Sequence, residues 1–135
     1  MKTAKELYEE EGYFYQTDYQ SMLNEFGDIL VQVDDEGYQG DSRVLYRDGK
    51  RFGWLQFGWG SCSGCDALQA CNSVEEVQEL MDELCNSIMW FDGPEEAIKF
   101  FESHDWEGDY SWHMDEQREF VRLVLETLRE VSAQN

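Results

Sequence analysis

The strongest constraint on the fold is a series of strand-like segments between residues 28 and 58. Residues 28–34 read DILVQVD, and apolar side chains at every second position predict a strand with one buried face. Residues 42–47 and 50–58 predict two further strands, and Asp48-Gly49 between them is typical of a two-residue hairpin turn. The sequence therefore predicts an antiparallel meander.

Helical patterns flank this meander on both sides. Ser73-Val74-Glu75-Glu76 is a capping box that begins a strongly amphipathic segment, and Pro94 fits the first turn of the next helix. Residues 88–91 predict a short fourth strand. The expected helices cover residues 2–11, 17–26, 65–71, 73–86, 94–104 and 114–131. Because the strands come first and most helices follow, we expect an α+β fold, a three- to four-stranded antiparallel sheet packed by C-terminal helices.

The chain length of 135 residues fits a single domain. We divide it into N-terminal helices (1–27), the meander (28–60) and an acidic helical part (61–135). Its 41% apolar and 15% aromatic content is enough to build a core. The N-terminal residues are polar, and no apolar run reaches the roughly 20 residues of a membrane span. We therefore expect a cytoplasmic protein.

Negative charge is the most pronounced feature of the composition. Thirty acidic residues against ten Lys and Arg give a net charge of −20. Residues 66–116 hold fifteen acids and a single base, Lys99, which is a net charge of −14. Such a field repels nucleic acids and anionic membranes and attracts basic surfaces. A DNA-reading or phosphate-binding role is therefore disfavoured, and the plain alternative to a functional acidic surface is a solubilising one.

The acidic residues of the second half form a candidate interface. Like charges four residues apart destabilise a helix by a few tenths of a kcal/mol each, so a helix that carries only acids suggests that the negative field has a use. Trp106 lies among them, and its ring suits an Arg-rich partner. The candidate interface residues are Glu75, Glu76, Glu79, Asp82, Glu83, Glu95, Glu96, Glu102, Asp105, Trp106, Glu107 and Asp109.

A Cys-x-x-Cys motif, Cys62-Ser63-Gly64-Cys65, follows the third predicted strand and allows several interpretations. It offers two thiolates at a spacing suited to zinc, but no second paired motif completes the site. It also matches the spacing of redox dithiols and of a catalytic Cys with a His, without the surrounding signature of either. We favour a structural role, in which small residues let strand and helix approach. The further zinc ligands on offer are Cys71, Cys85, His104 and His113.

Residues 60–68, GSCSGCDAL, resemble a motif of small uncharacterised bacteriophage proteins. The aromatic strand before the motif, and Ser73-Val74-Glu75-Glu76-Val77 and Trp90-Phe91-Asp92 after it, extend the resemblance over about residues 54–120. The resemblance implies a role in host takeover or anti-defence but transfers no catalytic residue. In charge and size the chain is similar to anti-CRISPR and anti-restriction proteins that mimic nucleic acids.

These observations favour a non-enzymatic acidic inhibitor that acts in the cytoplasm of a host cell. We expect it to bind the basic nucleic-acid-binding surface of a host defence protein through residues 73–86, 94–104 and 104–116, without a cofactor. Two alternatives stay open. One is a small zinc-stabilised structural or adaptor domain that uses Cys62 and Cys65, and the other is a Cys-dependent enzyme.

Overall fold

The computed structural model describes residues 1–11, 19–60, 64, 66–108 and 113–134. Four antiparallel strands form one sheet in the order β1-β2-β3-β4, so each strand pairs with its neighbour in sequence. The predicted α+β fold and meander are confirmed. In chain order the elements are α1 (Ala4–Glu11), α2 (Gln20–Leu23), β1 (Asp28–Asp34), β2 (Gly40–Asp48), β3 (Arg51–Trp59), α3 (Val74–Asn86), β4 (Met89–Phe91), α4 (Pro94–Ser103) and α5 (Met114–Gln134).

The hairpin between β2 and β3 turns at Gly49-Lys50, one residue later than the predicted Asp48-Gly49 turn. Asp48 pairs with Arg51, and Gly49 between them has a φ of 63°, a left-handed conformation that glycine adopts without strain. Gly53 in β3 is required for a different reason, since it faces Trp90 of β4. A Cβ atom at Gly53 would lie 2.7 Å from a methyl carbon of Ile88 and 2.8 Å from the Trp90 ring. A side chain at Gly53 would therefore collide with Ile88 and Trp90.

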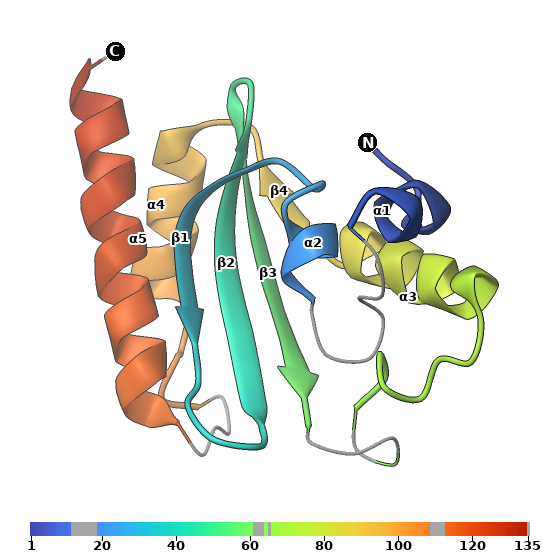
Figure 1. Cartoon of the computed structure of the whole chain (residues 1–135). Coiled ribbons are helices and arrows are strands. Elements are labelled where there is room, and N and C mark those ends of the chain that lie inside the picture. Colours follow the sequence, from blue (N-terminus) through green and yellow to red (C-terminus); the bar gives the residue numbers. More distant parts are fainter. Residues whose placement is uncertain (12–18, 61–63, 65, 109–112, 135) are drawn as a thin grey trace.

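Helices cover both faces of the sheet and make three layers (Figure 1). Helices α4 and α5 pack on one face, and α1, α2 and α3 pack on the other. The sequence predicts the packing by C-terminal helices, but α3 lies across the sheet from α4 and α5. In the described ranges, no helix combines the length and apolarity needed to cross a membrane.

Alternation along β2 and β3 supplies both cores. The single buried face predicted for residues 28–34 is wrong, because a bulge between Ile29 and Val31 puts Ile29 on the α1–α3 side and Val31 on the α4–α5 side. Val44 and Tyr46 of β2 face the layer of α1–α3, whereas Leu45 between them faces α4 and α5. The core on the α1–α3 side consists of Ala4, Leu7, Met22, Leu23, Phe26, Val44, Tyr46, Leu55, Leu68, Cys71, Val77, Met81, Leu84 and Ile88. The core on the α4–α5 side consists of Val31, Leu45, Phe52, Phe91, Ala97, Phe101, Phe120, Val124 and Leu128.

Two of the predicted helices differ in the structure. In the described part of the helix expected at residues 17–26, the α-helix is the four-residue α2. The N–H groups of Glu25 and Phe26 donate to the carbonyl three residues earlier, not four, so the α-helix does not continue through them. The helix expected at residues 65–71 is wrong for its described part, where residues 67–70 form a turn. One bond from the Ala70 N–H to the Asp66 carbonyl closes that turn.

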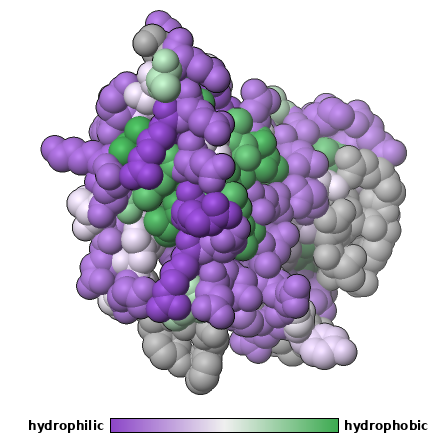
Figure 2. Space-filling model, turned by 90° about the vertical axis from the view of Figure 1, so that its left-hand side faces the viewer, coloured by the Kyte–Doolittle hydropathy of each residue, from purple (hydrophilic) through white to green (hydrophobic). Residues whose placement is uncertain are grey.

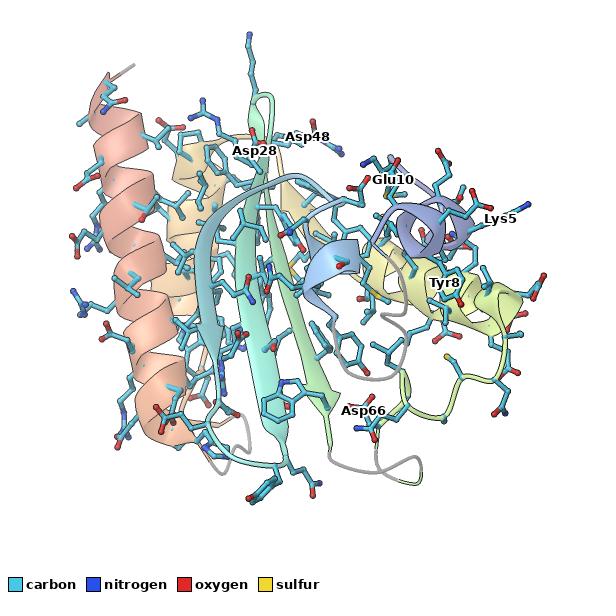
Figure 3. The ribbon with its side chains drawn as sticks, viewed as in Figure 1. Lys5, Tyr8, Glu10, Asp28, Asp48 and Asp66 are labelled. Atoms are coloured by element: carbon cyan, nitrogen blue, oxygen red, sulfur yellow. The ribbon has the colours of Figure 1, made fainter. Side chains whose placement is uncertain are left out.

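Asp66 joins the end of the sheet to this turn and to α2, and is labelled in Figure 3. Its Oδ1 accepts bonds from the Tyr19 hydroxyl at 2.7 Å and from the N–H groups of Leu68 and Gln69, and its Oδ2 accepts the Gly60 N–H at 2.9 Å. Only 6% of Asp66 is exposed. Burial, and then the bond to Asp66, raise the pKa of Tyr19, so its hydroxyl stays a proton donor.

The substitution Asp66→Asn tests this joint. The asparagine amide places an NH₂ group where one of the two carboxylate oxygens accepts hydrogen bonds in the parent protein. At least one buried N–H therefore loses its acceptor. We expect the free energy of unfolding to fall by about 2 kcal/mol in urea titration. Asp28→Asn changes charge equally at an exposed position and should leave stability within about 0.5 kcal/mol of the parent. Equal effects of the two substitutions would contradict the role of Asp66.

Candidate functional site: an acidic helix and a buried polar cluster

Helix α3 carries the densest part of the predicted interface. Ser73 caps it, since its Oγ accepts the Glu76 N–H at 3.1 Å. The apolar side of the helix, with Val77 and Met81 as its most buried residues, faces the sheet. Its acids are Glu75, Glu76, Glu79, Asp82 and Glu83, and all five are exposed.

No base offsets these five acids within the helix. Across the described ranges, no Lys, Arg or His nitrogen lies within 4.0 Å of an α3 carboxylate oxygen. Among the described residues, the one hydrogen bond to these carboxylates comes from the uncharged Gln78 amide, which donates to Asp82 at 2.8 Å. The negative charge of α3 is therefore left for the solvent or for a partner.

The other predicted interface acids lie in the opposite layer. Glu95, Glu96 and Glu102 belong to α4, and Asp105 and Glu107 follow it. Several of them have partners inside the protein. Arg129 of α5 bonds Glu102 at 3.0 Å, and Arg118 of α5 bonds Glu107 at 3.0 Å. Asp109 lies outside the described residues.

Trp106 was expected at the interface, and the structure places its ring among other aromatic side chains. The ring stacks on Phe101 with centroids 5.3 Å apart, and its Nε1–H donates to the Phe101 carbonyl at 2.9 Å. Trp54 of β3 meets it edge-on at 5.2 Å. Trp106 therefore anchors the segment after α4 to the sheet.

Helix α5 differs from α3 because it interleaves acids with arginines. Arg122 bonds both Glu119, at 2.7 Å, and Glu126, at 3.1 Å. The hydrogen bond and charge of Glu119 raise the pKa of Arg122, and Arg122 in return lowers the pKa of Glu119. The face that includes α5 is mainly hydrophilic, with apolar side chains visible between the polar ones (Figure 2). The two helical layers therefore differ in charge balance, and α3 is the uncompensated one.

A buried polar cluster that the sequence did not reveal lies where β1, β2 and α5 meet. Arg43 of β2 is fully buried, and its Nη1 donates to Asp35 Oδ1 at 2.6 Å. Its Nε donates to Gln117 Oε1 of α5, also at 2.6 Å. The second carboxylate oxygen of Asp35 accepts the Asp41 N–H at 2.7 Å. Arg43 shares the strand face of Leu45, so alternation alone places it toward the interior.

His113 and Glu116 extend this cluster toward the surface. His113 Nε2 lies 3.8 Å from Asp35 Oδ2, and His113 Nδ1 lies 3.7 Å from Glu116 Oε2. One ligand atom from each of Asp35, His113 and Glu116 can be chosen so that all three lie within 4.8 Å of one another. Over the described part of the chain, this is the one group of three or more potential metal ligands.

A zinc site is one of the alternatives that the Cys-x-x-Cys motif leaves open. Cys62 and Cys65 lie outside the described residues, so the zinc and dithiol interpretations stay predictions. Among the ligands proposed to complete the site, Cys71 and Cys85 are free thiols, and His104 packs in the aromatic cluster of Trp54 and Phe100. None of these three joins a group of three potential ligands within the described ranges.

Cys71 and Cys85 are poor candidates for a reactive thiol. Burial, and then the charges of Glu76, Asp66 and Glu79, raise the pKa of Cys71. Burial and the charge of Asp82 raise the pKa of Cys85. Because the thiolate is the nucleophile, both side chains stay in the unreactive form near neutral pH.

A thiol-labelling experiment checks this assignment. In the variant Cys62→Ser/Cys65→Ser, the two remaining thiols should react with an aromatic disulfide reagent more slowly than a free thiol at pH 7. The rate should rise with pH through the raised pKa values, since deprotonation produces the nucleophile. The same protein in denaturant is the control and should react at the rate of free cysteine. Fast labelling of the folded variant would contradict the assignment.

The ion pair of the buried cluster is tested by a double-mutant cycle. Arg43→Met leaves the Asp35 carboxylate buried without its cation, and we expect about 3–5 kcal/mol of destabilisation by urea titration. Asp35→Leu/Arg43→Met removes both charges and should recover part of that loss. A double variant less stable than Arg43→Met alone would show that the penalty does not come from the unpaired carboxylate.

Comparison with known proteins adds no relative: no family model, no curated protein and no solved structure matches this chain. The resemblance to bacteriophage proteins therefore stays an expectation from the sequence, and the function has to be inferred from the residues of the chain itself.

Proposed function

We propose that the protein is a non-enzymatic acidic binding protein that docks on the basic, nucleic-acid-binding surface of another protein. The observation that carries the proposal is helix α3, which exposes five carboxylates with no cation in reach within the described residues. The predicted use of α4 as a second half of the same surface is less well supported, because α4 lies across the sheet from α3 and shares its acids with α5.

The charge spacing of α3 supports mimicry of a nucleic acid strand. Glu75 and Glu83 lie about 12 Å apart along the axis, given a rise of about 1.5 Å per residue. Five charges over that length are about one per 3 Å, close to the spacing of about 3.4 Å along one DNA strand. A basic groove that binds a phosphate backbone is therefore a suitable electrostatic partner for α3.

The packing of α3 explains how the protein can keep this surface. Leu84, Met81 and Val77 anchor the helix in the core, so its stability comes from burial and does not need favourable charge pairs. Rigid attachment to the sheet also keeps the carboxylates in a fixed array. A fixed array loses less conformational entropy on binding than flexible acidic tails do.

The partner class to test first follows from the predicted phage context. That context favours a host defence protein that binds DNA or RNA, and the chain would inhibit it by occupying its nucleic-acid site. Binding should weaken steeply as salt rises, because exposed charges are screened over about 8 Å at physiological ionic strength.

The test compares charge reversal on the two helical layers. Glu75→Lys/Glu79→Lys/Glu83→Lys alters α3, and Glu119→Lys/Glu126→Lys/Glu130→Lys alters α5. Each triple variant changes the net charge from −20 to −14. Immobilised parent protein captures basic partners from nuclease-treated host lysate at low salt, and each captured protein is then assayed for DNA and RNA binding.

We expect the parent and the α5 variant to inhibit nucleic-acid binding by the captured partner, and the α3 variant to lose inhibition by at least about tenfold. The proposal fails if no nucleic-acid-binding protein is captured, or if the two triple variants behave alike. Circular dichroism of all three proteins is the control for folding.

A further inference from the structure

We propose that Asp35, His113 and Glu116 form a binding site for one divalent transition-metal ion. Asp35 follows β1, His113 immediately precedes α5 and Glu116 lies in its first turn, so the site joins two parts of the chain about eighty residues apart. The site lies in the α4–α5 half of the molecule, across the sheet from α3, so it is independent of the proposed docking surface.

The three side chains lie close to the spacing that a small ion needs, within 4.8 Å of one another. Donor atoms about 2.1 Å from a tetrahedral metal are about 3.4 Å from each other. The distances from His113 Nε2 to Asp35 Oδ2 and from His113 Nδ1 to Glu116 Oε2 are 3.8 Å and 3.7 Å. A metal takes one ring nitrogen, so Glu116 has to turn toward it. Side-chain exposures of 30% for His113 and 33% for Glu116 leave room for that rotation and a path from solvent.

Asp35 is held in place by a shell of further contacts, as metal-binding carboxylates usually are. Arg43 bonds Oδ1, and the Asp41 N–H bonds Oδ2, which leaves the second lone pair of Oδ2 for an ion. Gln117 fixes the Arg43 guanidinium in turn. A Cβ atom on Gly40 would lie 2.5 Å from Asp35 Cβ, so the Asp35 side chain has little freedom to move away.

An independent observation is the second terminal nitrogen of Arg43. Arg43 is fully buried, and its Nη2 has no hydrogen-bond partner among the described residues, although Nη1 and Nε of the same group are bonded. Buried donors are nearly always paired. Nη2 belongs to the guanidinium that bonds Asp35, so an unsatisfied buried donor lies beside the proposed site.

The ligand set indicates which ions fit. Two carboxylates and one imidazole are hard to borderline donors, which suit Mn²⁺ and Zn²⁺. Three protein ligands leave further positions for solvent or a small ligand, as in open metal sites. Mn²⁺ is the better probe, because thiolates prefer Zn²⁺ and the chain has four Cys that could compete for it.

The test is a titration of the full chain with Mn²⁺, in which the electron paramagnetic resonance signal of the free ion is followed. About 0.15 M monovalent salt suppresses diffuse association with the acidic surface. We expect one saturable site per chain. Glu116→Gln and His113→Gln should each weaken it by about tenfold or more, since each removes a direct ligand.

Asp115→Asn is the matched control. It removes the same charge as Glu116→Gln from the neighbouring residue, whose side chain is 96% exposed, and should change the affinity by less than about twofold. Circular dichroism shows whether each variant is folded. The proposal is overturned if no saturable site is found, or if Glu116→Gln and Asp115→Asn have equal effects in folded protein.

Discussion

The buried ion pair between Arg43 and Asp35 is the interaction on which the α5 side of the fold depends. It joins the turn after β1 to β2, and through Gln117 it joins both to α5. A charge pair taken out of water stabilises a protein only when its remaining donors and acceptors are satisfied, and most of those in this cluster are. The pair therefore acts mainly as a positional constraint that fixes how α5 lies against the sheet.

Asp66 has the corresponding role on the other side of the sheet. A single carboxylate accepts four hydrogen bonds from residues before and after the end of β3. The aromatic and glycine-rich stretch around Trp54–Asp66 is in this respect a structural joint. Because Asp66 and the Arg43–Asp35 pair fix the elements around the sheet, α3 attaches to the sheet through its apolar side alone. Its acidic side is therefore available to carry a function.

Local patterns were sufficient for most of the sheet and for α3. Alternation along β2 and β3, a two-residue turn with Gly49 and the Ser73 cap are short-range signals that the structure has, although the turn lies one residue later than predicted. In β1 a bulge between Ile29 and Val31 breaks the predicted alternation. Patterns failed where a short helix depends on its surroundings, as at residues 65–71. They also did not indicate the Arg43, Asp35 and Gln117 cluster, since Gln117 is 74 residues from Arg43 in sequence. The one local indication was that Arg43 lies two residues before Leu45 and therefore shares its inward strand face.

The sequence by itself determined the fold class, the presence of the β2–β3 hairpin and the excess of negative charge, because these follow from periodicity, turn chemistry and composition. Only the tertiary structure decided that α3 and α4 lie on opposite faces of the sheet and that Arg129 of α5 pairs with Glu102 of α4. Charge compensation depends on distances of a few ångströms between segments remote in sequence, and packing sets those distances. Packing also brings His113 close to Asp35. Residues that share no sequence motif thereby form one candidate metal site, together with Glu116.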